Sequence, residues 1–120
     1  MEEGYTETLS KTFNRSGFKT GFLKLAILKM VSSGPAHGYA LMKSIERVTD
    51  KDWKPSPGSI YPALQDLEKK GLISVSTMGR RRIYEITPKG RVVLSEAVTH
   101  VKEVLGYLNK LFEGSEEWKS

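Results

Sequence analysis

The sequence predicts a mainly helical fold with a minor β component, in which three helices are followed by a two-stranded β-hairpin and one long last helix. Apolar residues recur at helical spacing over four segments. Two short runs of strand-forming residues flank a turn between the third and fourth of these segments. The 120 residues, 38% hydrophobic and 28% charged, suit one domain with an ordinary core and exclude wholesale disorder.

The first two helices follow a polar start. Residues 1–17 carry few apolar anchors, so we expect an arm or a short, weakly held helix. Residues 18–31 are densely apolar, which is typical of a helix buried on most sides, and Gly34 and Pro35 end it. The second helix is predicted from about residue 38 to residue 49 by apolar residues at helical spacing, namely Leu41, Met42, Ile45 and Val48.

The third helix is predicted from Pro57 to about Lys70, after a loop rich in proline and glycine. Ser56 is expected to cap its free N–H groups through the hydroxyl, while Pro57 fits the first helical position. The strands are predicted over residues 72–77 and 82–87, with residues 78–81 as the turn.

The last helix starts at Thr87-Pro88 by the same cap-plus-proline logic and runs to about Phe112. The predicted fold class is therefore a winged helix-turn-helix domain over residues 18–87, whose hairpin is the two-stranded wing. A long C-terminal dimerisation helix follows over residues 88–113, with a tail over residues 114–120.

Composition excludes several classes of function. The absence of Cys removes disulfides, thiol nucleophiles and Cys-type zinc sites, and two His residues are too few for most catalytic or metal sites. No catalytic set or phosphate-cradling glycine loop occurs, so we expect no enzyme and no cofactor. No apolar run approaches a membrane span, which predicts a cytoplasmic protein. A net charge of +5 favours an anionic partner, though weakly.

The outward face of the third helix is small and uncharged at its start, which suits close approach to duplex DNA. The helix N-terminus attracts phosphate, and the Gln65 amide has the geometry to read an adenine edge. In the alternative interpretation, the serines only cap the helix and Tyr61 packs on the neighbouring helix. The candidate DNA-binding residues are Ser56, Gly58, Ser59, Tyr61, Pro62 and Gln65.

The predicted hairpin tip carries Arg80, Arg81 and Arg82. Residues 79–91 hold five cations, Lys89 among them, against Glu85 alone, which gives a net charge of five minus one, or +4. Because arginine binds phosphate oxygens and enters narrow minor grooves, this stretch is the strongest electrostatic indication of DNA binding. At the start of the second helix Tyr39 and Lys43 are further candidates, the alternative being a structural His37 and a half-buried Tyr39.

Three stretches resemble the PadR family of transcriptional regulators: GPAHGYALMKSIE (34–46), SPGSIYPALQDLEKKGLI (56–73) and GRRRIYEITPKGR (79–91). The resemblance covers residues 20–112 and implies a winged-helix DNA-binding domain, a dimerisation helix and repression of genes for detoxification, efflux or stress. It implies operator contacts by residues 56–65, with Tyr61 taking part, and by residues 79–82 of the wing, which is shorter here than in many relatives.

The last helix carries an apolar stripe with the 3.5-residue average spacing that two paired helices need. We therefore expect a homodimer whose seam contains Leu94, Val98, Val101, Leu105, Leu108 and Phe112. The alternative is that the helix folds back on its own first helix. In a two-fold dimer the recognition helices would read inverted half-sites about 34 Å apart.

These residues predict a sequence-specific DNA-binding transcriptional regulator, a repressor that binds an inverted-repeat operator of double-stranded DNA as a homodimer. The alternative is a winged-helix protein-interaction module without DNA binding. A small-molecule effector is compatible with this function, but its identity is open. The resemblance also implies a possible site for aromatic drugs between tryptophans at the dimer interface, as in some PadR-family members, but residues 87–112 contain no Trp. Trp53 is expected to anchor its loop by packing.

Overall fold

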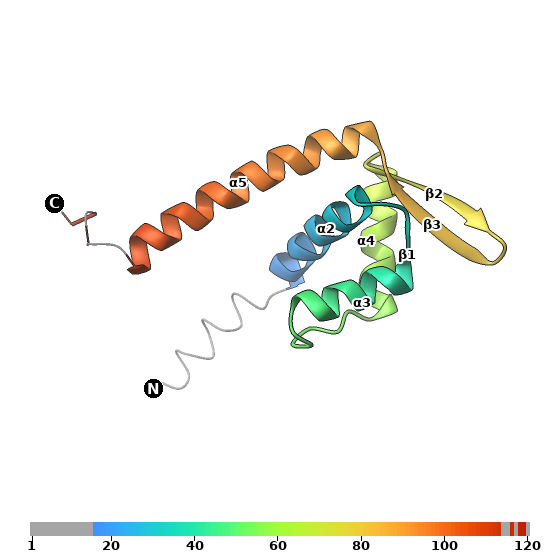
Figure 1. Ribbon diagram of the computed structural model, residues 1–120, viewed down its shortest axis with the longest axis horizontal. Coiled ribbons are helices and arrows are strands. Elements are labelled where there is room, and N and C mark those ends of the chain that lie inside the picture. Colours follow the sequence, from blue (N-terminus) through green and yellow to red (C-terminus); the bar gives the residue numbers. More distant parts are fainter. Residues whose placement is uncertain (1–15, 114–115, 117, 120) are drawn as a thin grey trace.

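The computed structural model describes residues 16–113, 116, 118 and 119 (Figure 1). Most of the predicted N-terminal arm therefore lies outside the described residues, as does most of the tail. The elements follow each other as α2 (Ser16–Ser32), β1 (Ala36–His37), α3 (Gly38–Val48), α4 (Pro57–Lys69), β2 (Ile73–Met78), β3 (Arg81–Ile86) and α5 (Pro88–Glu113). The predicted fold class, a winged helix with a hairpin wing and a long last helix, is confirmed.

The core lies where α2, α3 and α4 pack together. Its most deeply buried side chains are aliphatic and come from all three helices, with the sheet adding Ile73 and Tyr84. Helix α2 contacts the other three helices and β3, so it occupies the centre of the domain, with α5 crossing it on one side (Figure 1). Trp53 packs partly buried against this core, 5.7 Å from the Phe22 ring, as expected of a loop anchor.

The sheet has three antiparallel strands in the order β1-β3-β2. Strand β1 was not predicted, because two residues show no periodicity; Ala36 pairs with Tyr84 and His37 with Ile83. The predicted four-residue turn was wrong. Met78 pairs with Arg81, so the turn contains two residues and starts with Gly79 at a φ of 67°. Glycine adopts this left-handed conformation without steric cost.

The starts of α4 and α5 differ in their capping. The hydroxyl of Ser56 makes no capping hydrogen bond, contrary to prediction, because it lies 3.3 Å from the Ser59 hydroxyl instead. At α5 the prediction is confirmed, since the Gly90 N–H donates to the Thr87 hydroxyl oxygen at 3.0 Å.

The base of α5 is fixed tightly to the rest of the domain. The Thr87 N–H donates to the Leu72 carbonyl at 3.1 Å, and the Thr87 hydroxyl donates to the Gly71 carbonyl at 2.6 Å. A Cβ atom on Gly90 would lie 2.0 Å from the Leu72 carbonyl oxygen, closer than any real contact allows. Only glycine therefore permits α5 to cross the start of β2 at this distance.

An ion-pair network joins α2 to α4. The Asp66 carboxylate lies 2.7 Å from the Lys24 ammonium and 2.8 Å from the Lys70 ammonium. Hydrogen bonds from Lys24 and then Lys70 lower the pKa of Asp66 from 3.8 to about 2. The ionised Asp66 carboxylate therefore links α4 to Lys24 of α2.

Candidate nucleic-acid interface

The first half of α4 presents a continuous exposed surface. Ser56, Gly58, Ser59, Pro62 and, one turn further, Gln65 are all exposed. Pro62 has no N–H, so the Gly58 carbonyl lacks its usual hydrogen-bond partner within the helix. Small side chains and free backbone groups allow another molecule to approach the helix closely.

Tyr61 connects this face to α3. Its ring lies across Gly38, and a Cβ atom there would lie 3.0 Å from the Tyr61 hydroxyl oxygen and 3.1 Å from its Cε1 atom. The side chain keeps 40% of its surface exposed while Gly38 is buried beneath it. Tyr61 therefore packs on the neighbouring helix, as the alternative interpretation expected, and it also remains accessible at the surface; its contact with DNA stays a prediction.

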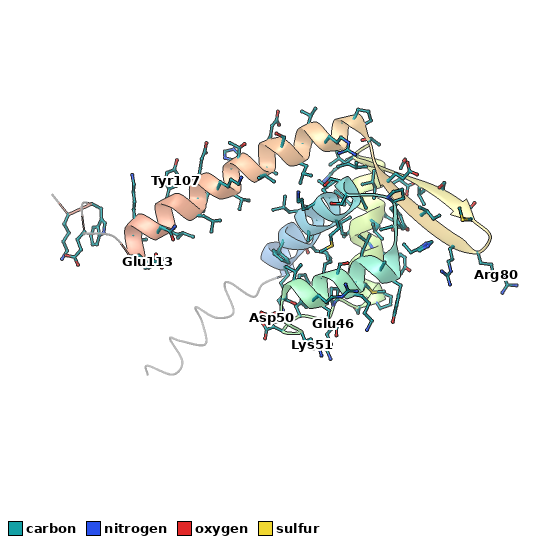
Figure 2. All side chains as sticks on the ribbon, in the orientation of Figure 1. Glu46, Asp50, Lys51, Arg80, Tyr107 and Glu113 are labelled. Atoms are coloured by element: carbon teal, nitrogen blue, oxygen red, sulfur yellow. The ribbon has the colours of Figure 1, made fainter. Side chains whose placement is uncertain are left out.

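The three wing arginines project beside this face. Arg80 lies in the turn, and Figure 2 shows its side chain extending from the tip of the hairpin into solvent. Arg81 and Arg82 follow on β3 and are exposed. Within the described part of the chain, none of the three lies within 4 Å of a carboxylate. Their positive charges are therefore available to an external anion.

A cleft of about 510 Å³ lies between α3, α4 and the wing. It collects the three arginines, both candidate tyrosines and the residues that begin α3, and none of its lining residues is acidic. The lining residues are His37, Gly38, Tyr39, Ala40, Tyr61, Arg80, Arg81, Arg82 and Tyr84. We call this hollow the wing cleft.

Sequence reasoning missed part of the wing cleft. The buried Tyr84 and the β1 residue His37 form its wall, and the Nδ1 atom of His37 lies 3.3 Å from the Arg82 carbonyl oxygen. This pairing links residues 45 positions apart, which local pattern does not reveal. The one available signal was Gly38, whose lack of a side chain admits the Tyr61 ring.

Two candidates on α3 differ in their surroundings. Tyr39 lines the wing cleft and is 65% exposed, so the half-buried alternative is wrong. Lys43 does not line the cleft; its ammonium lies 5.6 Å from the centre of the Tyr39 ring and 3.6 Å from the Glu46 carboxylate. Glu46 therefore offsets part of the Lys43 charge.

Lys89 lies apart from the other candidates. Its ammonium donates to the Lys70 carbonyl at 2.8 Å, at the C-terminal end of α4. Ser56 precedes the other end of this 13-residue helix, about 20 Å away. The structure thus gives Lys89 a contact with the last carbonyls of α4 and does not place it at the wing cleft.

The apolar stripe of α5 is divided between two environments. Leu94 is buried in the core of its own subunit and Val98 is half-buried against that core. From Thr99 to Glu113 every residue is exposed. The exposed part of the predicted seam contains Val101, Leu105, Leu108 and Phe112, which are 40–76% exposed.

The described residues also bear on two other kinds of site. In residues 16–113 no three His, Asp or Glu side chains lie close enough to hold a metal ion. None of the helices described offers an apolar stretch long enough to cross a bilayer.

Comparisons with known proteins agree on one family. The sequence model of the "Transcriptional regulator PadR-like family" matches residues 27–96, from α2 into α5. The transcriptional regulator YqjI of Escherichia coli is 39% identical over 80 residues, 66% of this chain and 39% of that protein. The transcriptional regulator Rv3488 of Mycobacterium tuberculosis is 35% identical over 83 residues, 66% of this chain and 75% of that protein.

A solved structure shows the same arrangement. The PadR-like transcriptional regulator of Bacillus cereus superposes with a TM-score of 0.73 at 30% identity, covering 83% of this chain and all of that one. The chain spans about two fifths of the length of YqjI.

Proposed function

Because the chain belongs to the PadR-like family of transcriptional regulators, we propose that it is a repressor that binds an inverted-repeat operator in duplex DNA as a homodimer. The observation that carries this proposal is the wing cleft, where three exposed arginines line one hollow together with Tyr61 of the recognition helix α4. As a member of this family the chain is a regulator and not an enzyme.

The geometry supports insertion of α4 into the major groove. An α-helix fits that groove, and the small residues Ser56, Gly58 and Ser59 let the backbone come close to the bases. Gln65 is exposed on the same helix, and its amide has the donor and acceptor needed for two hydrogen bonds to an adenine edge. Direct base contacts of this kind would supply the sequence specificity.

The wing supports the contact with the DNA backbone. Arg80, Arg81 and Arg82 are exposed donors beside the recognition helix, and their guanidinium groups suit phosphate oxygens or a narrow minor groove. Tyr39 and Tyr61 add hydroxyl donors at the same cleft. Such contacts would fix the orientation of the protein on DNA and make binding depend strongly on salt.

The exposed half of α5 supports dimerisation. Apolar side chains on a helix need a partner, and this chain leaves Leu105, Leu108 and Phe112 uncovered. A second copy related by a two-fold axis would cover them and place two copies of α4 about one helical turn of DNA apart, roughly 34 Å. Occupation of the operator by this dimer would block access of polymerase to the promoter.

The test is footprinting on the DNA upstream of the chain's own gene, followed by a binding series in rising salt. We expect protection of an inverted repeat and a linear fall of log affinity with log salt concentration. A duplex of the same composition in shuffled order is the control. Equal affinity for the two duplexes, or binding that does not respond to salt, would contradict the proposal.

A further inference from the structure

A second hollow, separate from the wing cleft, lies between the C-terminal half of α2 and the first half of α5. Its volume is about 400 Å³, within the range of roughly 300–1,000 Å³ typical of small-molecule sites. We call it the α2–α5 groove. It shares no residue with the wing cleft, and its lining residues are Lys29, Ser32, Arg91, Leu94, Ser95, Val98, Thr99 and Lys102.

The groove keeps charged hydrogen-bond donors available, because the protein itself uses the hydroxyl donors of Ser32 and Thr99 and only part of the Arg91 guanidinium. The Ser32 hydroxyl donates to the Lys29 carbonyl at 2.5 Å, and Arg91 donates to the Ser32 carbonyl at 3.4 Å. The Thr99 hydroxyl donates to the Ser95 carbonyl at 3.1 Å. The donors that remain for a ligand are the two ammonium groups, the other N–H groups of the Arg91 guanidinium and the Ser95 hydroxyl.

The charge of the groove is not balanced from within. Three of its eight lining residues are cations and none is an acid. Among the residues that the structure describes, no carboxylate lies within 4 Å of Lys29, Arg91 or Lys102. The two carboxylates nearest in sequence on α5 belong to Glu96 and Glu103, which do not line the groove, and Glu103 faces His100 instead.

Leu94 and Val98 give the groove an apolar wall, where α5 packs on the core. A ligand that fits both features has an anionic oxygen-rich head and a short apolar body. We propose that the α2–α5 groove binds a small organic oxyanion, a phosphate or a carboxylate, with its head between Lys29, Arg91 and Lys102. Because the groove is formed by the core helix α2 and the long helix α5, such a ligand would stabilise their packing.

The test is calorimetric titration of the full chain with butyl phosphate and with pentanoate, in chloride buffer of constant ionic strength. Inorganic phosphate and 1-butanol serve as the isolated head and body. We expect at least one of the two complete ligands to bind more tightly than either isolated part. In the double variant Lys29→Gln/Lys102→Gln its affinity should fall by about ten-fold or more, since two charge-assisted hydrogen bonds to the head are removed.

The matched control is Lys69→Gln/Lys110→Gln, which removes the same charge from exposed positions outside the groove. It should leave the affinity for butyl phosphate or pentanoate unchanged. The proposal is overturned if neither ligand binds, or if both double variants lose affinity equally, which would indicate unspecific attraction of anions.

Duplex DNA is the other anion to which the groove could respond. Both double variants should bind duplex with the same affinity if the groove serves a small ligand. A larger loss in Lys29→Gln/Lys102→Gln would make the groove a second DNA contact and would overturn the proposal. The titration with small anions needs no DNA, so its result does not depend on the proposed function.

Discussion

The Tyr61 ring lies across the backbone of Gly38, with its hydroxyl oxygen 3.0 Å from the point that a Cβ atom on Gly38 would occupy. This contact joins the start of α3 to the exposed face of α4. A methyl group at position 38 would displace the Tyr61 ring, which is the movable partner in this contact. The orientation of Tyr61 therefore depends on the absence of a side chain one helix away.

The first prediction concerns this contact. Gly38→Ala should weaken operator binding about five-fold or more, equivalent to about 1 kcal/mol, because Tyr61 is displaced. Fluorescence anisotropy with an operator duplex measures the change. Gly21→Ala is the control, since nothing lies within 4 Å of a Cβ there, and it should stabilise α2 by up to about 1 kcal/mol without affecting binding. If the two variants bind the operator duplex with equal affinity, Tyr61 does not contribute to the DNA interface.

The second prediction concerns the wing. Replacing Arg80, Arg81 and Arg82 by Ala should lower the affinity for every duplex, and the slope of log affinity against log salt should become shallower by about 0.9 for each phosphate that is no longer neutralised. Because all three side chains are exposed, the free energy of unfolding should stay nearly unchanged. A salt series together with chemical denaturation measures both. If the slope of log affinity against log salt is unchanged, the wing arginines do not contact DNA phosphates.

The third prediction concerns the exposed stripe of α5. Leu105→Asp should convert the proposed dimer to a monomer, because an unpaired carboxylate in an apolar seam is costly. The fold of the single chain should tolerate the change, since Leu105 is 53% exposed there. Light scattering coupled to size exclusion gives the mass, and circular dichroism checks that the helices persist. His100→Asn, on the same helix and also exposed, should stay dimeric. An intact Leu105→Asp dimer would place the interface elsewhere.

The fourth prediction concerns the base of α5. Gly90→Ala should destabilise the protein by about 3 kcal/mol or more, because the added Cβ would lie 2.0 Å from the Leu72 carbonyl oxygen. Thermal unfolding measures the loss. Gly106→Ala on the same helix meets nothing within 4 Å in the chain and should be neutral or stabilising for the fold. Similar melting temperatures for both variants would contradict the close crossing.

The fifth prediction concerns pH. The pKa of Asp66 is lowered to about 2, so its ionised form stabilises the fold above the unfolded-state pKa of about 4, and this contribution disappears as the pH falls through 2. The side chain is one-third exposed, so solvent screening keeps the effect small. Asp66→Asn should be less stable than the parent at pH 7. The difference should shrink between pH 4 and pH 2, as measured by denaturation at each pH; a constant difference would rule out this linkage.

The order of the elements was predictable because each helix carries its own periodicity and stop signal. Apolar spacing located α3, Pro57 located the start of α4, and Thr87-Pro88 located the start of α5. These signals depend only on residues that are close in sequence, so they can be recognised in a single sequence. The exposed arginines of the wing were predictable for the same reason, since three adjacent cations have few ways to be buried.

Most of the features that escaped prediction join distant parts of the chain. Strand β1 exists because β3 supplies its hydrogen bonds, and Lys89 contacts the Lys70 carbonyl because α5 crosses the end of α4. The Ser56 hydroxyl is a local exception, because it lies next to the Ser59 hydroxyl and does not bond to the free N–H groups of α4. The burial of Leu94 likewise depends on how α5 lies on α2, which the heptad spacing does not encode.

His37 ends β1 and immediately precedes α3, so the wing and the helix-turn-helix share one joint. The pairing of His37 with Ile83 lies within the hairpin, two residue pairs before the pair Met78–Arg81 that closes the turn. Residues inserted at the turn would therefore extend the reach of the hairpin and leave its anchorage intact. The length of the hairpin, and with it the distance that the wing spans along a bound duplex, can thus change during evolution while the rest of the domain stays the same.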